Sequence, residues 1–173
     1  MRPRILALLL VLGLTAAARL AAVEPADLQR VLDVIGREEP KAVVLEIELD
    51  SGWDGGLVSV QTDTGHEYYI RLHGGRIEER ERERADWEDR QVARDIAGGA
   101  SFLGLVEAYA RVLEEMRSSG AYDGVSSAHF RSIEYEVEYR RPAIEVDFDV
   151  SGDTLSVYVD PETGEIIMSE WDE

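Results

Sequence analysis

Apolar residues recur at two spacings along the chain, and the order of these spacings occurs twice. In each half, a segment with apolar residues three and four positions apart precedes segments in which every second residue is apolar. The first spacing is typical of a helix with one buried face, and the second of a strand with one buried face. The pattern therefore predicts an α+β protein made of two tandem units, since self-similarity on this scale indicates an internal repeat.

The first unit is expected over residues 25–80. A helix is predicted for residues 25–38, because apolar residues recur there at helical spacing and Pro40 disfavours its continuation. Its buried face consists of Leu28, Val31, Leu32 and Ile35. Alternation then predicts strands at residues 43–49, 58–62 and 68–72 and a short strand around Ile77, with turns at the glycines between them.

A charged segment, residues 81–99, separates the two units. In the run "EERERERADWEDR" opposite charges fall three residues apart, which would support a helix slightly. We therefore expect a charged helical linker, with Trp87 as its contact to the rest of the protein. The pair Gly98-Gly99 marks the start of the second unit.

The second unit is expected over residues 100–173. A helix is predicted for residues 102–117, and its apolar surface is wide enough to contact more than one element. Strands are predicted at residues 133–139, 144–150, 155–159 and 166–168, with a turn at residues 160–164, where Pro161 presets φ and Gly164 tolerates positive φ. Each unit is thus expected to be one helix packed on a four-stranded antiparallel sheet, since the strands alternate apolar with acidic residues as in a sheet buried on one face. Whether the two units share one sheet stays open.

The first 22 residues have the features of an export signal. Arg2 and Arg4 precede an apolar run that extends to Leu14, and alanines follow it. Cleavage is expected after Ala18, which has small residues at the last and third-last positions, or after Ala22. An uncleaved anchor is the alternative, although the apolar run is shorter than the roughly 18 residues that a span needs. The protein is therefore expected in the periplasm or secreted from a bacterium, with no membrane span after cleavage.

Charge and cysteine content exclude several classes of partner and site. The chain has 18 basic and 36 acidic residues, a net charge of −18, and removing residues 1–22 leaves −21 because three arginines and no acid are lost. Nucleic acid is not an expected partner, since its phosphates require clustered Lys and Arg. The chain has no Cys, which excludes disulfides, thiolate metal sites and Cys nucleophiles.

Two stretches resemble the PepSY domain family, which includes propeptide segments of secreted peptidases. They are "LQRVLDVIGREEPKAVVLEIELDSG" with "LVSVQTDTGHEYYIRLHGGRIEE", and "IEVDFDVSGDTLSVYVDPETGEIIMSE". Together they cover about residues 25–80 and 101–170, although the first copy has a shorter final turn and the second a longer connection after its helix. The resemblance implies a cystatin-like fold in each unit. It also implies a non-catalytic domain that binds or regulates another protein, a peptidase or an envelope sensor, and it brings no catalytic residues.

No arrangement of residues predicts a catalytic, cofactor or metal site. Asp147, Asp149, Ser151 and Asp153 match the opening of a calcium-binding EF-hand loop, but Tyr158 stands where that loop needs a bidentate Glu. The three histidines have no spacing typical of zinc ligands. We therefore expect no cofactor and no metal.

The polar face of the second sheet and a few aromatic residues are the candidate contacts to a partner. They are Trp53, Tyr69, Glu134, Glu136, Glu138, Asp147, Asp149 and Tyr158, and Trp171 is a further aromatic candidate. Rows of carboxylates on an open sheet face are either solvated or receive a basic partner. The leading hypothesis is a non-enzymatic binding or regulatory protein. The alternatives are a carrier that holds a small ligand or peptide between helix and sheet, and a hydrolase that uses carboxylates.

Overall fold

The structure is a computed structural model, and it describes residues 22–49, 57–61, 66–73, 76–85, 87–97, 101–138 and 141–172. These residues form three α-helices and eight strands, so the α+β class is confirmed. The helices are α1 (Pro25–Glu38), α2 (Trp87–Ala97) and α3 (Leu105–Ser119), and a 3₁₀ turn, η1, spans Ser127–His129. The strands are β1 (Val43–Glu48), β2 (Leu57–Gln61), β3 (His66–His73), β4 (Arg76–Arg84), β5 (Phe130–Glu138), β6 (Arg141–Val150), β7 (Asp153–Val159) and β8 (Ile166–Asp172).

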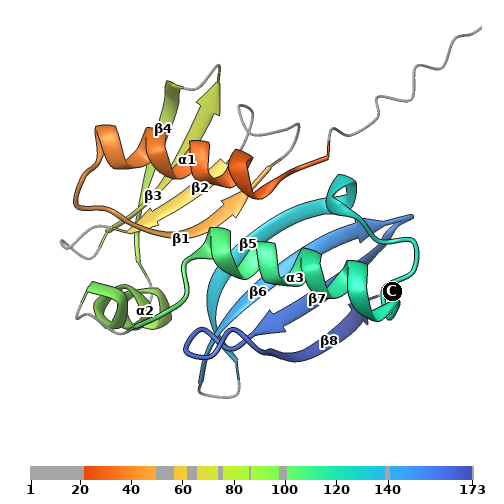
Figure 1. Ribbon diagram of the computed structural model, residues 1–173. Helices are drawn as coiled ribbons and strands as arrows, with labels where there is room; N and C mark the ends of the chain where they lie inside the picture. Colours follow the sequence, from red (N-terminus) through yellow and green to blue (C-terminus); the bar gives the residue numbers. More distant parts are fainter. Residues whose placement is uncertain are drawn as a thin grey trace, which may run out of the picture.

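The strands that the structure describes form one antiparallel sheet in the order β4-β3-β2-β1-β5-β6-β7-β8 (Figure 1). Sequential strands are neighbours except at the centre, where β1 pairs with β5 and joins the two halves of the chain. This central pairing is short, with Ile47 opposite Ile133 and flanking pairs on either side. Both halves therefore contribute to a single sheet, whose two edge strands are β4 and β8.

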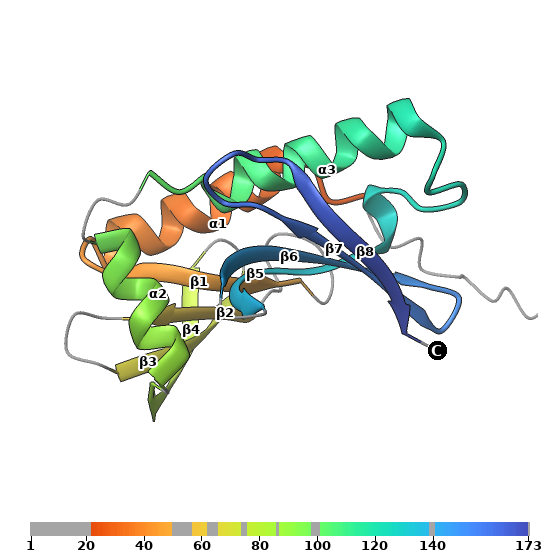
Figure 2. The same cartoon turned by 90° about the horizontal axis from the view of Figure 1, so that it is seen from below.

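Helices α1 and α3 lie side by side on one face of the sheet, and neither covers the other face (Figure 2). Their apolar residues and those of the strands below form one continuous core that includes Leu28, Ile47, Tyr109 and Ile133, all inaccessible to solvent. A helix and a strand each bury one apolar face, and this two-layer arrangement buries both. Helix α2 packs against the central strands β1 and β5, where its Val92 and Ala93 form a second, smaller apolar cluster with Leu45.

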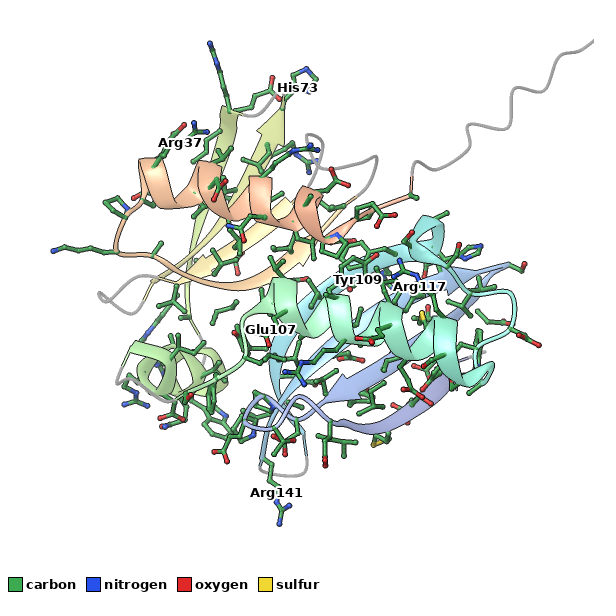
Figure 3. All side chains as sticks on the ribbon, viewed as in Figure 1. Arg37, His73, Glu107, Tyr109, Arg117 and Arg141 are labelled. Carbon is green, nitrogen blue, oxygen red and sulfur yellow. The ribbon has the colours of Figure 1, made fainter. Side chains whose placement is uncertain are left out.

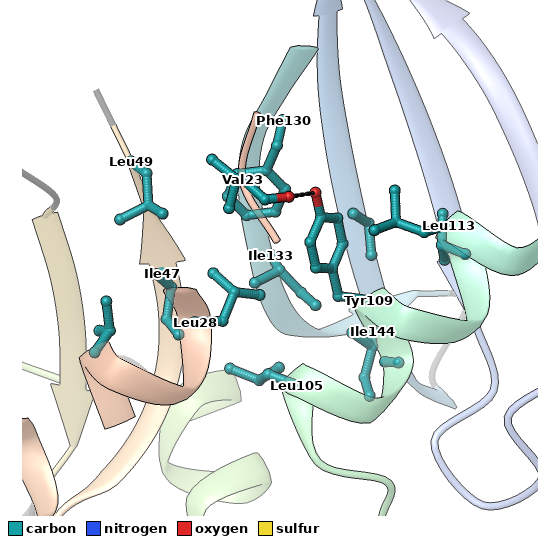
Figure 4. Packing of buried hydrophobic residues seen from close by; sticks show 14 of the residues in the cluster. Val23, Leu28, Ile47, Leu49, Leu105, Tyr109, Leu113, Phe130, Ile133 and Ile144 are labelled. Atoms are coloured by element: carbon teal, nitrogen blue, oxygen red, sulfur yellow. Dashed lines mark hydrogen bonds between the residues drawn. The ribbon is translucent and has the colours of Figure 1, made fainter. Parts of the chain in front are cut away.

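Tyr109 lies at the centre of the core, between α3 and the sheet (Figure 4). Its ring packs edge-on against Phe130 at 4.8 Å between centroids and stacks near Phe148 at 6.3 Å. Its hydroxyl donates a hydrogen bond of 2.7 Å to the carbonyl of Val23. Because Val23 N–H also donates to the carbonyl of Ser127, the segment before α1 is attached to the second half of the chain.

Local sequence explains where the elements begin and end. Pro25 occupies the first turn of α1, and the Asp27 carboxylate accepts the N–H of Glu24 ahead of the helix. Helix α3 ends at Gly120, whose φ of 62° is left-handed. In the turn between β7 and β8, the Asp160 carboxylate accepts the N–H groups of Glu162 and Thr163. The predicted turn at residues 160–164 is therefore confirmed.

The prediction of a helical linker over residues 81–99 is wrong at its first part. Strand β4 continues to Arg84 and pairs with β3 along its length, and the helix in this region is α2, from Trp87 to Ala97. Glu and Arg alternate at every position from 79 to 84, and this alternation has the period of a strand. Opposite charges three positions apart also suit a helix, and pairing with β3 decided in favour of the strand. The fourth strand is accordingly longer than predicted.

Helix α3 begins at Leu105 and not at residue 102. The Leu103 N–H donates a hydrogen bond of 2.6 Å to the carbonyl of Pro161, which holds residues 101–104 outside the helix against the β7–β8 turn. Helix α1 has the predicted bounds. The expected signal over residues 1–22 lies outside the described part of the chain except for Ala22. In the part that the structure describes, no helix has both the length and the apolar character needed to cross a bilayer.

Candidate functional site

Acidic residues line up across the sheet on the face opposite α1 and α3. Glu46 of β1 is directly opposite Glu134 of β5, which is directly opposite Glu145 of β6. Residues two apart on a strand share a face, so the neighbouring acids lie on the same side. We call this set the carboxylate face, and it consists of Glu46, Glu48, Glu134, Glu136, Glu145, Asp147 and Glu170.

Glu134 is the central residue of the carboxylate face. Burial, followed by the charges of Glu46 and Glu145 and then those of Glu136 and Asp147, raises its pKa from the ordinary value of 4.5 to about 8. Protonated Glu134 therefore predominates at neutral pH. The face loses one negative charge in this way, because like charges directly opposite on adjacent strands repel.

Asp147 lies in the next row of the same face. Its carboxylate accepts the hydroxyl of Ser156 at 2.7 Å and that of Ser132 at 3.2 Å, and both serines are buried. Burial raises the pKa of Asp147, while the two serine hydroxyls oppose that rise. This row crosses β5, β6 and β7 as a hydrogen-bonded set, with Ser132 opposite Asp147 and Asp147 opposite Ser156.

Tyr158 adds an aromatic side chain to the carboxylate face. It is opposite Glu145 on one side, and its hydroxyl donates a hydrogen bond of 3.1 Å to Glu170. Burial raises its pKa, and hydrogen bonds to Glu145 and Glu170 raise it further. The phenol thus stays protonated and acts as a hydrogen-bond donor among the acids.

The structure brings four of the eight predicted contact residues together on this face: Glu134, Glu136, Asp147 and Tyr158. Asp149 is on β6 beyond them; it is exposed, accepts the Thr154 hydroxyl at 3.2 Å and lies 3.9 Å from Arg131. Tyr69 and Glu138 belong to β3 and β5, but their side chains are outside what the structure describes, and Trp53 is outside it entirely. Trp171 lies on the edge strand β8 and is exposed.

Glu46 and Glu145 were not among the predicted contact residues. Their polar positions are evident from strand alternation, but their proximity to Glu134 depends on which strands are neighbours. Glu145 follows from the β5–β6 hairpin, whereas Glu46 reaches the cluster only through the β1–β5 pairing between the two halves. Alternation of Glu with apolar residues in both halves is the one signal that could have pointed to it.

The described residues contain no group of three or more His, Asp or Glu side chains arranged to hold a metal ion. His73 lies at the end of β3, far from Arg141 at the start of β6 (Figure 3). His129 lies in η1, where its ring accepts the N–H of Ser126. Clustered carboxylates on one face of a sheet attract cations.

Glu134 lines none of three hollows found among the described residues. One, of about 330 Å³, lies between α1, α2 and α3 and is lined mainly by apolar side chains. Its hydroxyl-bearing residue is Tyr135, whose OH already donates to the carbonyl of Leu103 at 2.7 Å. A second, of about 420 Å³, adjoins Tyr158 and the start of β8. The third, of about 600 Å³, lies between α3 and the β7–β8 turn.

No protein-family model matches the chain, and no curated protein matches it in sequence. Among solved structures, a "putative lipoprotein" from Clostridium difficile 630 matches at 14% identity with a TM-score of 0.48, over 87% of this chain and 94% of that one. A similarity of this size supports no conclusion about fold or function. The PepSY resemblance and the expected export therefore stay predictions.

Proposed function

We propose that this chain is an exported, non-enzymatic regulatory protein of the PepSY type that binds a basic segment of a partner protein, a peptidase or an envelope sensor. The proposal includes two tandem units, each consisting of a helix followed by four strands. The element order supports this, since α1 precedes β1 to β4 and α3 precedes β5 to β8.

The carboxylate face is the observation that carries the proposal. Glu46, Glu134 and Glu145 stand directly opposite one another on three adjacent strands, an arrangement that costs free energy when all three are ionised. A cationic side chain placed over them would remove this cost and complement the net charge of −18. The Tyr158 hydroxyl and Glu170 extend the acceptor surface toward β8.

Binding of a cation should change the protonation of Glu134. Its raised pKa of about 8 keeps it protonated near pH 7, and a nearby positive charge would lower that pKa. Association with a basic segment is therefore expected to release protons at neutral pH. Calorimetric titration with a Lys-rich peptide in two buffers of different ionisation enthalpy measures this release directly.

Affinity capture from an envelope extract at moderate salt, followed by mass spectrometry, tests the proposal as a whole. The double variant Glu46→Gln/Glu145→Gln removes two charges from the face, and Glu114→Gln removes an exposed carboxylate of α3 as the matched control. A partner is expected on the unmodified protein and on Glu114→Gln, and it should be lost from the double variant. Equal recovery from all three, or recovery of no protein, would contradict the proposal.

A carrier function is the second candidate, and the apolar hollow between the three helices favours it. Leu32, Ile35 and Leu105 line its wall, and its volume of about 330 Å³ suits a small apolar ligand. Tyr135 alone offers a hydroxyl, so the ligand would be held by apolar contact. Binding of the fluorescent probe 1-anilinonaphthalene-8-sulfonate, whose aromatic rings enter apolar sites, is compared between the unmodified protein and Gly104→Leu to test this candidate.

A further inference from the structure

The two edges of the sheet have opposite characters. An edge strand presents unpaired N–H and C=O groups and invites pairing with another strand, and charged side chains are a common protection. The β4 edge has this protection, since Glu and Arg alternate along its second half. The sequence of β8, Ile-Ile-Met-Ser-Glu-Trp-Asp, has no Lys, Arg or Pro, and its two charged residues, Glu170 and Asp172, lie on one face of the sheet. Strand β8 is therefore the more accessible edge.

Large apolar side chains are exposed on β8. Trp171 is 51% exposed and Ile167 is 54% exposed, and Trp87 of α2 is the other exposed large hydrophobic residue of the described chain. The β7–β8 ladder is regular from Met168 to Asp172, with its irregularity confined to the Ile167 end. A strand added outside β8 would thus have five regular residues to pair with.

The two faces of β8 differ in chemistry. On the side of the sheet that carries the carboxylate face, Glu170 and Asp172 follow Met168 at alternate positions, and the hollow beside Tyr158 opens at Ile167 and Met168. On the helix side, Trp171 is opposite Leu155 of the core. A strand placed along this edge would have one row of side chains beside carboxylates and the other beside an exposed Trp ring.

We infer that the free edge of β8 binds an extended segment of a partner protein in which basic and apolar side chains alternate, so that the segment becomes a ninth strand of the sheet. Main-chain hydrogen bonds hold such a segment, and its alternate side chains give specificity. The basic residues meet Glu170 and Asp172, and the apolar residues cover Trp171. A second copy of this chain suits the edge poorly, because it brings the same carboxylates and a net charge of −18. The inference rests on the proposed function, in that it assumes a protein partner, and it names the edge and the kind of segment.

The probe is a synthetic decapeptide of alternating Lys and Val. Its control is the same peptide with every backbone nitrogen methylated, which keeps the charges but has no N–H on either edge to pair as a strand. Binding is measured by calorimetry, and hydrogen exchange locates it. The Trp171→Lys variant adds a charge to the β8 edge, and Trp87→Lys makes the same change at a Trp on α2 that is also more than half exposed. We expect the unmodified peptide to bind and to protect amides of residues 168–172. N-methylation and Trp171→Lys should each weaken binding at least tenfold, while Trp87→Lys leaves it unchanged.

Equal binding of both peptides, or unchanged binding to Trp171→Lys, would overturn the inference. If the Glu46→Gln/Glu145→Gln variant abolished binding in that case, the proposed function would stand and the edge would be the wrong site. Absence of binding by the alternating peptide, or concentration-dependent dimerisation that Trp171→Lys abolishes, would also overturn the inference.

Discussion

Replacement of Glu134 by Gln should change the pH dependence of folding stability. The pKa of Glu134 is raised from 4.5 to about 8 by burial and by the charges of Glu46 and Glu145. Between these two values the folded protein binds more protons than the unfolded chain, so stability falls as the pH rises from about 4.5 to about 8. At about 1.4 kcal/mol per pKa unit the loss amounts to at most about 5 kcal/mol, because the carboxylates can separate as they ionise.

The Gln side chain has nearly the same shape and no charge, so Glu134→Gln should be more stable than the unmodified protein at pH 8 by a few kcal/mol. At pH 4.5 the two proteins should agree within about 0.5 kcal/mol. Urea denaturation followed by circular dichroism, at several pH values from 4.5 to 8.5, measures the difference. Glu114→Gln, an exposed change on α3, should keep the slope of the unmodified protein. The reasoning is refuted if Glu134→Gln keeps that slope as well.

Three further substitutions test the packing and the helix ends. Tyr109→Phe leaves the buried Val23 carbonyl without its donor and should cost about 1–3 kcal/mol in the free energy of unfolding, measured by urea denaturation; no loss would mean that the bond contributes nothing. Gly36→Ala should stabilise α1 by about 0.5–1 kcal/mol, since apart from its chain neighbours and the backbone of its own helix nothing lies within 4 Å of the added Cβ. Gly120→Ala should destabilise the protein by about 1 kcal/mol, because the φ of Gly120, +62°, is left-handed. Thermal unfolding measures both glycine variants, and a shift of the unfolding temperature in the same direction for both would contradict the reasoning.

Sequence patterns predicted an element more accurately where its residues fitted the period of a helix or that of a strand, but not both. Helix α1 has the predicted bounds because its apolar residues recur at helical spacing and Pro40 follows it. The charged run before α2 fits both periods. Its opposite charges three positions apart suit a helix, and its alternation of Glu with Arg suits a strand. The β3 strand beside it decided for a strand up to Arg84.

The candidate site was predicted only where it depends on the alternation of residues within one strand. Glu134, Glu136 and Asp147 alternate with apolar residues, so their common polar face follows from the period of a strand. The raised pKa of Glu134 does not follow from that period. It depends on burial and on Glu46, which is 88 residues away in sequence and directly opposite in the sheet.

By itself, the sequence determined the α+β class, the helix α1, the turn at residues 160–164 and the polar face of each strand, because these depend on neighbours within a few residues. Only the tertiary structure decided that β1 pairs with β5, that both halves share one sheet, and that β8 is left as an accessible edge. Strand pairing between distant segments depends on how the apolar faces of α1, α3 and both sets of strands are buried together, and no local pattern encodes that choice.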